Sequence, residues 1–112
     1  MAYDEGVAQR VREQLQARAE ITERKMFGGL AFMAHGHMFV GILGDRLMVR
    51  VGPDRYAKAL SQAHVREMDF TGRPLKGYVY VEPDGFESDA QLESWVNQGY
   101  VFVGTLPPKL SK

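Results

Sequence analysis

Two histidines, His35 and His37, lie two residues apart and are the side chains of this sequence best suited to bind a metal ion. On a strand, such a pair points to one face, so both imidazoles can reach the same ion. A metal needs three or four ligands, however; His64 is distant in the sequence, and no acidic residue lies within the hairpin to complete a set. Polar residues around a glycine are also typical of a hairpin tip. We therefore predict a solvated turn, with a metal site as the alternative, and no cofactor.

The segment KMFGG, residues 25–29, places a lysine beside two glycines whose backbone N–H groups could cradle a phosphate. A phosphate-binding P-loop has the pattern GxxxxGK, followed by serine or threonine and then a helix. Here the lysine precedes the glycines, and a strand-like run follows. We predict that Gly28 and Gly29 mark a bulge or a bend within one strand.

The loop FTGRPLKGY, residues 70–78, carries Arg73 and Lys76 three residues apart, between glycines and a proline that restrict the backbone. Together with Lys25 and Arg50 they could form an anion-binding pocket, because arginine binds phosphate with two donors and lysine acts as a point charge. Solvated loop charges are the alternative interpretation.

Hydrolytic chemistry finds little support in this sequence. The serines lie in no nucleophile-elbow pattern, the acidic residues are scattered, and there is no cysteine. The aromatic runs YVYV and GYVFV could stack nucleic-acid bases, but their spacing is more typical of a core. We predict no catalytic residues.

Hydrophobic periodicity predicts the elements that must position these side chains. Helices are expected over residues 4–18, 53–61 and 88–106, and strands over residues 25–34, 38–43, 46–51 and 77–81. Asp4 and Ser88 are the expected N-caps of the outer helices, and Gln91 completes a capping box with Ser88. The polar segment over residues 62–77 is predicted to be a loop, long enough to be functional. One further short strand, between residues 77–81 and the last helix, remains open.

Length and composition indicate one domain over residues 1–112, since 45% hydrophobic residues suffice for a core at this size. The N-terminus lacks a signal peptide, and no apolar run reaches the roughly 18 residues of a membrane-spanning helix. We expect a cytoplasmic protein without membrane contact. The net charge is zero, but residues 24–76 hold nine basic and four acidic residues. An anionic ligand should therefore meet the middle of the chain first.

Four motifs, KMFGGLAF, LMVRVGP, MDFTGRPLKGYVYV and TLPPK, occur in this order. With them, the chain resembles the N-terminal domain of the TfoX/Sxy family of bacterial competence regulators. The resemblance implies an α+β fold, with a curved antiparallel sheet and helices packed on it, similar to the YgaC/TfoX-N and secretion-chaperone-like group, and often dimeric. It also implies a link to transcriptional control of DNA-uptake genes, and places recurring basic positions at Lys25, Arg50, Arg73, Lys76 and Lys109.

The sequence therefore predicts a noncatalytic, TfoX-like binding module. We expect a homodimer that acts through a protein partner or an anionic ligand. We also expect a stand-alone domain, because the second, C-terminal domain of the full-length regulators is absent from this sequence. The alternatives are an enzyme or enzyme accessory acting on a phosphorylated small molecule, and a weak nucleic-acid binder that uses the basic middle region, although the net charge does not support nucleic acid.

Overall fold

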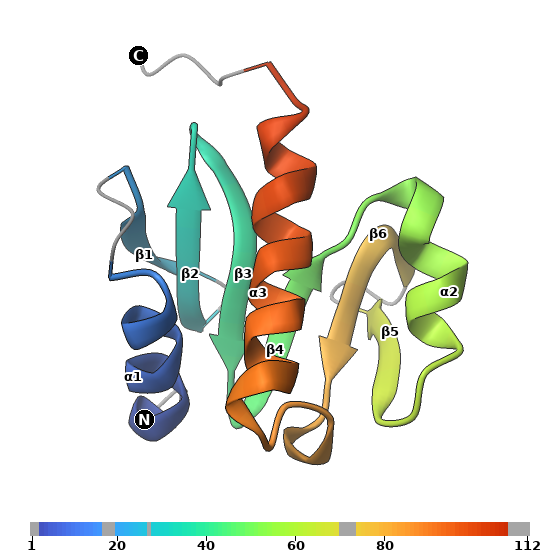
Figure 1. Ribbon diagram of the computed structural model, residues 1–112, viewed down its shortest axis with the longest axis horizontal. Helices are drawn as coiled ribbons and strands as arrows, with labels where there is room; N and C mark the ends of the chain where they lie inside the picture. The colour runs from blue at the N-terminus through green and yellow to red at the C-terminus, as the bar shows by residue number, and fades with distance from the viewer. Residues whose placement is uncertain (1–2, 17–19, 27, 70–73, 108–112) are drawn as a thin grey trace.

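A computed structural model of the chain describes residues 3–16, 20–26, 28–69 and 74–107, and Figure 1 shows its helices and strands. The helices in these ranges are α1 (Glu5–Gln14), α2 (Tyr56–Leu60) and α3 (Asp89–Gly104), with two short 3₁₀ helices, η1 (Pro53–Arg55) and η2 (Pro83–Gly85). The strands are β1 (Thr22–Met26), β2 (Gly29–Ala34), β3 (His37–Leu43), β4 (Arg46–Arg50), β5 (Val65–Asp69) and β6 (Pro74–Val81).

The six strands form one sheet in the order β1-β2-β3-β4-β6-β5, and every neighbouring pair is antiparallel. Strands β1 to β4 follow one another as a meander. The chain then crosses through η1 and α2 to the far edge, forms β5, and returns as β6 between β5 and β4 (Figure 1). The predicted α+β fold, with helices from the start, the middle and the end of the chain packed on an antiparallel sheet, is confirmed.

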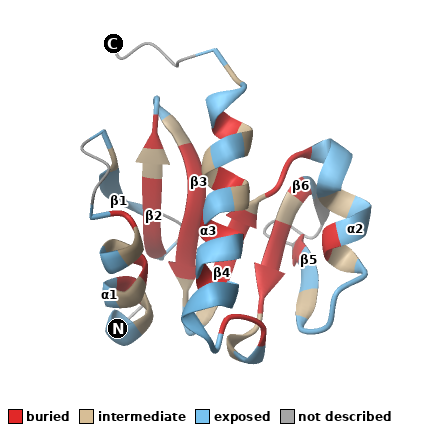
Figure 2. Cartoon of the chain, in the orientation of Figure 1, coloured by how far each residue is buried: buried red, intermediate tan, exposed pale blue. Residues whose placement is uncertain are grey.

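The main core lies between the sheet and the helices, on what we call the helix face of the sheet. Its strand residues are large and apolar, and all are buried: Leu30, Phe32, Ile42, Leu47, Val49, Val79 and Val81. The helices add their own buried stripes: Ala8, Val11, Ala59, Leu92, Trp95, Val96 and Val103. Figure 2 shows these buried stripes as red segments. Burial of each large side chain contributes about 2 kcal/mol, so this layer is the principal source of stability.

Helix α3 is held against the sheet by features that its sequence predicts. Ser88 caps it, and the predicted capping box with Gln91 is confirmed. A Cβ atom on Gly99 would lie only 2.3 Å from the carbonyl oxygen of Phe39, so the glycine is needed for close packing of α3 on β3. Near the start of the helix, the buried indole N–H of Trp95 donates to the carbonyl of Gly85 at 3.1 Å.

The segment KMFGG corrects one prediction. It contains a hairpin turn between β1 and β2, in which Met26 pairs with Gly29, and is not one bent strand. Gly28 has a φ of 75°, a left-handed conformation that suits a tight hairpin turn and disfavours residues with a Cβ. Gly29 lets β3 approach, because a Cβ atom there would lie 2.2 Å from the carbonyl oxygen of Ile42.

The prediction of a loop over residues 62–77 is also wrong. This segment contains β5, which the sequence did not predict, and the first residues of β6. The further short strand that the sequence left open was expected after residues 77–81, where the structure has η2 instead. Strand β5 is an edge strand that pairs with β6 alone, so it needs no continuous apolar pattern, and its sequence VREMD is mostly polar.

Candidate functional site

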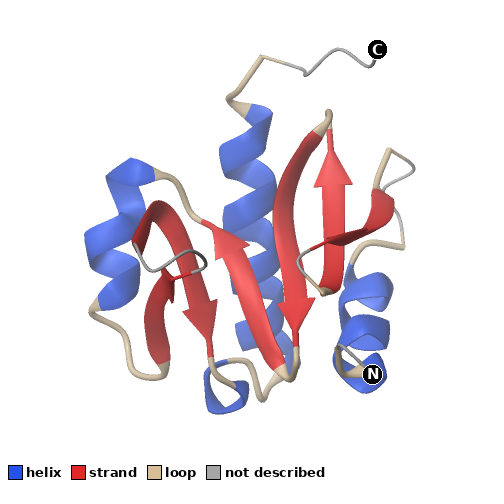
Figure 3. Cartoon of the chain, turned by 180° about the vertical axis from the view of Figure 1, so that it is seen from behind, coloured by secondary structure: helices blue, strands red, loops and turns tan. Residues whose placement is uncertain are grey.

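The sheet face opposite the helix face, which we call the back face, carries one complete row of side chains across all six strands. Directly paired residues on antiparallel strands point to the same side, so the strand register defines the row. It consists of Arg24, Ala31, Gly41, Met48, Tyr80 and Arg66. The row begins and ends with arginine and is small or apolar between them. Figure 3 shows this face from behind, and none of the described helices lies on it.

The middle of the back face is nevertheless buried. A second apolar cluster contains Ala31, Met38, Met48, Met68 and Tyr80, with Met33, Leu43 and Tyr78 packed against it. Met48 has no exposed surface and Tyr80 only 5%, so this part of the back face is a second apolar layer. Methionine suits such a surface, because its flexible thioether fills irregular gaps and contacts aromatic rings favourably.

Two arginines of β4 lie on tyrosine rings of β6. The guanidinium carbon of Arg46 lies over the ring of Tyr80, 4.1 Å from its centroid. The guanidinium carbon of Arg50 lies 5.3 Å from the ring centroid of Tyr78 and 5.5 Å from that of Phe102 in α3. These distances fall in the cation–π range. The rings therefore hold Arg46 over the apolar cluster, and Arg50 at the end of the sheet, near Tyr78 and Phe102.

Neither of these two arginines has an acidic partner among the described side chains. Other arginines do. Arg12 binds Glu23 at 2.8 Å, and this hydrogen bond raises the pKa of Arg12. Arg66 forms an ion pair with Glu82 at 3.4 Å. Arg46 and Arg50 are thus half-buried cations whose position is set by aromatic rings, and whose hydrogen-bond donors are available for an anion.

Glycines explain how Arg50 comes to contact both a β6 ring and an α3 ring. Gly52 and Gly77 lie side by side at the end of β4, and the N–H groups of Val51 and Gly52 both donate to the carbonyl of Gly77, at 2.8 and 3.0 Å. A Cβ atom on Gly52 would lie 2.5 Å from the ring of Phe102. The missing side chain allows Phe102 to reach the end of the sheet, where Arg50 lies.

The structure does not bring all predicted anion-binding residues together. Lys25 pairs with Leu30 and therefore belongs to the helix face, whereas Arg50 pairs with Tyr78 of the back face. Lys76 is exposed on β6, but the positive φ of Gly77 next to it breaks the alternation, so the register does not assign its face. Arg73 and Lys109, which the resemblance also indicated, lie outside the described residues.

Sequence reasoning overlooked Arg46, although the signal was present. In RLMVR, Arg46, Met48 and Arg50 alternate with buried Leu47 and Val49, which places both arginines on one side of the strand. What no single strand reveals is the pairing with β6, which supplies the two tyrosines.

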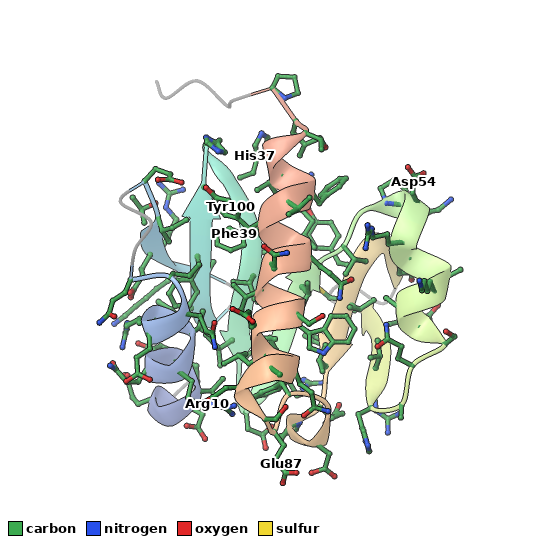
Figure 4. All side chains as sticks on the ribbon, viewed as in Figure 1. Arg10, His37, Phe39, Asp54, Glu87 and Tyr100 are labelled. Atoms are coloured by element: carbon green, nitrogen blue, oxygen red, sulfur yellow. The ribbon has the colours of Figure 1, made fainter. Side chains whose placement is uncertain are left out.

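The histidines form the predicted hairpin tip. His35 and Gly36 have φ values of 56° and 82°, and together they connect Ala34 to His37, the last pair of β2 and β3. His37 forms a hydrogen bond with the C-terminal end of the described chain: its Nε2 lies 2.8 Å from the carbonyl oxygen of Pro107. Figure 4 shows His37 beside the end of α3. The described residues contain no group of three or more side chains that could hold a metal ion.

A shallow groove of about 460 Å³ lies on the other side of Phe102, between η1 and α3. Its walls are mixed: Val51, Val101 and Phe102 are apolar, and Asp54, Arg55, Asn97 and Gln98 are polar. Phe102 thus contributes both to this groove and to the position of Arg50. Separately, no helix in the described part of the chain has the length and apolar character needed to span a membrane.

The fold and the candidate site together define a small α+β domain with a helix-covered face and an arginine-bearing back face. The TfoX N-terminal domain family matches residues 13–103, which is most of the chain, so this protein belongs to that family. The predicted resemblance is therefore confirmed. All the strands, and every arginine of the back face named above, lie within the matched region. A search of the curated proteins finds no match to the chain.

Proposed function

We propose that this TfoX N-terminal domain is a noncatalytic binding module that holds an anionic partner against the back face of its sheet. The observation that carries the proposal is the pair Arg46 and Arg50, each placed over a tyrosine ring without an acidic partner among the described residues. Arg24, at one end of the cross-strand row, extends the positive charge to the edge strand β1, whereas Arg66 at the other end is paired with Glu82.

The chemistry of these groups suits binding rather than catalysis. A guanidinium group has five N–H donors in a planar arrangement that matches phosphate or carboxylate oxygens, and it stays protonated in proteins. It therefore cannot exchange a proton as a general acid or base. Because aromatic rings already hold Arg46 and Arg50, less side-chain entropy is lost when an anion binds them.

We further propose that this binding serves a regulatory role in the transcription of competence-type genes. Support comes from the match to the TfoX N-terminal domain family. The resemblance of the chain to this family of competence regulators is the reason for expecting a role in transcription. In the source bacterium, substitution of Arg46 and Arg50 by alanine should change transcription of DNA-uptake genes as deletion of the protein does. Unchanged transcript levels in both strains would contradict this role.

The binding proposal is tested with inorganic polyphosphate as the probe, in titration calorimetry at about 50 mM salt. Arg46→Ala and Arg50→Ala should each weaken binding by roughly tenfold, since a charge-assisted hydrogen bond contributes about 1.5 kcal/mol or more. Lys58→Ala is the matched control, because it removes one exposed positive charge from α2, which packs on the helix face. Absence of binding, or an equal loss with Lys58→Ala, would refute the proposed site.

A further inference from the structure

We infer that the anionic partner of the back face is a single-stranded nucleic acid, whose bases stack on the guanidinium planes of Arg46 and Arg50. This inference rests on the proposed function and adds the chemical class of the ligand. It starts from the geometry of the two pairs, Arg46 over Tyr80 at 4.1 Å and Arg50 beside Tyr78 at 5.3 Å.

Each guanidinium group has two flat sides. Arg46 lies near one ring, Tyr80, whereas Arg50 lies near two, Tyr78 and Phe102, so Arg46 has the more open stacking surface. Arg46 and Arg50 are only partly buried, so the remaining surface of each group can be reached from solvent. Unpaired bases stack on arginine planes as they do on aromatic rings. A base bound in this way would extend the existing stack of tyrosine and arginine, while the N–H donors at the edge of the guanidinium bind a phosphate.

The separation of the two arginines favours a polymer over a single phosphate group. Arg46 and Arg50 lie four residues apart on β4, which corresponds to about 13 Å along a strand. The two guanidinium groups lie near different tyrosines, Tyr80 and Tyr78, and a chain of nucleotides can bind both at once. Arg24 adds positive charge at the β1 edge of the cross-strand row, whereas Arg66 at the other edge is paired with Glu82.

The form of the back face favours single strands over a duplex. Proteins read duplex DNA mainly by inserting a helix or a β-ribbon into the major groove. All the described helices lie on the opposite side of the sheet, and none projects from the back face (Figure 3). In a duplex, moreover, the bases are stacked on one another and their flat sides are not accessible to arginine.

The test compares three probes by competition against a fluorescein-labelled oligothymidylate of about 20 nucleotides. The unlabelled single strand should compete well, and its affinity should fall steeply with salt. A duplex of equal length and inorganic polyphosphate should compete less well. Arg46→Lys and Arg50→Lys retain the charge but lose the planar stacking surface. Each should weaken single-strand binding by roughly tenfold and leave polyphosphate binding unchanged.

The outcomes separate this inference from the proposed function. If polyphosphate binds and the oligothymidylate does not, or if the duplex binds equally well, the inference is overturned while the anion-binding module stands. If the lysine variants bind the single strand as tightly as the parent, stacking is refuted. If no anion binds, both proposals fail. Urea unfolding of each variant, followed by circular dichroism, verifies that a weakened variant is still folded, and Lys58→Ala is again the charge control.

Discussion

At the scale of single residues, the half-buried Tyr56 of α2 has an unusual hydroxyl group. Its hydroxyl is shielded from solvent and has no hydrogen-bond partner among the described residues. Burial raises the pKa of Tyr56 above its ordinary value of 10.0, and the negative charge of Glu67 raises it further. A buried hydroxyl without a partner costs about 1 to 3 kcal/mol, so this site weakens the fold.

Tyr56→Phe should therefore raise the free energy of unfolding at neutral pH by about 1 kcal/mol, measured by urea unfolding. The parent should also lose stability above pH 10 relative to the variant. Its unfolded state releases the tyrosine proton at the ordinary pKa of 10.0, whereas the folded state retains it to higher pH. A variant that is less stable than the parent at pH 7 would show that the hydroxyl has a partner.

The candidate site illustrates which residue-level features can be predicted from the sequence. The shared face of Arg46 and Arg50 follows from the two-residue period of a strand, and Arg50 was among the predicted residues. The separation of Lys25 from Arg50 could not be predicted, because it depends on the register of strand pairs. A shift of one residue would have placed Lys25 on the other face.

At the scale of elements, the well-predicted segments contain their own start and stop signals. Both N-caps, Asp4 and Ser88, form the expected hydrogen bonds, because a cap is a contact between neighbours in the sequence. The two edge strands were missed. Their sequences, TERKM in β1 and VREMD in β5, are largely polar. Such strands form because the backbone N–H and C=O groups of a neighbouring strand pair with theirs.

The packing of α3 on β3 gives a prediction with an internal control. Gly99→Ala should lower the free energy of unfolding by about 3 kcal/mol, since its Cβ atom would lie 2.3 Å from the carbonyl oxygen of Phe39. Gly104→Ala, in the same helix, meets no atom within 4 Å and should leave the protein equally or slightly more stable. Urea unfolding distinguishes the two variants, and an equal loss for both would argue against the close contact.

At the scale of the whole molecule, a net charge of zero conceals an uneven distribution. Four arginines of the back face, Arg24, Arg46, Arg50 and Arg66, belong to the strands. Helix α3, on the helix face, carries Asp89 and Glu93 and no basic residue. A partner with negative charge is thus attracted to one side of the molecule. Two copies meeting through their back faces would bring arginine against arginine, which disfavours this face as a dimer interface.

We propose that the protein forms a homodimer through the surface around Val101, which is 54% exposed and is the exposed large hydrophobic residue of the described chain. Light scattering should then give twice the chain mass of 12.6 kDa. Val101→Glu should reduce the mass to that of one chain, because it places a charge in the interface, while Arg50→Ala should not change it. A mass of 12.6 kDa for the parent at every concentration would contradict the dimer.

The position of Trp95 has a practical consequence for all these measurements. It is the single tryptophan of the chain and is 5% exposed. Its indole N–H donates a hydrogen bond to the carbonyl of Gly85 in the helix-face core. Its fluorescence emission should shift strongly to the red on unfolding, when water reaches the ring. Ligands on the back face approach the opposite side of the sheet and do not contact the indole. Tryptophan emission therefore reports folding in this protein, and it should not change when a ligand binds to the back face.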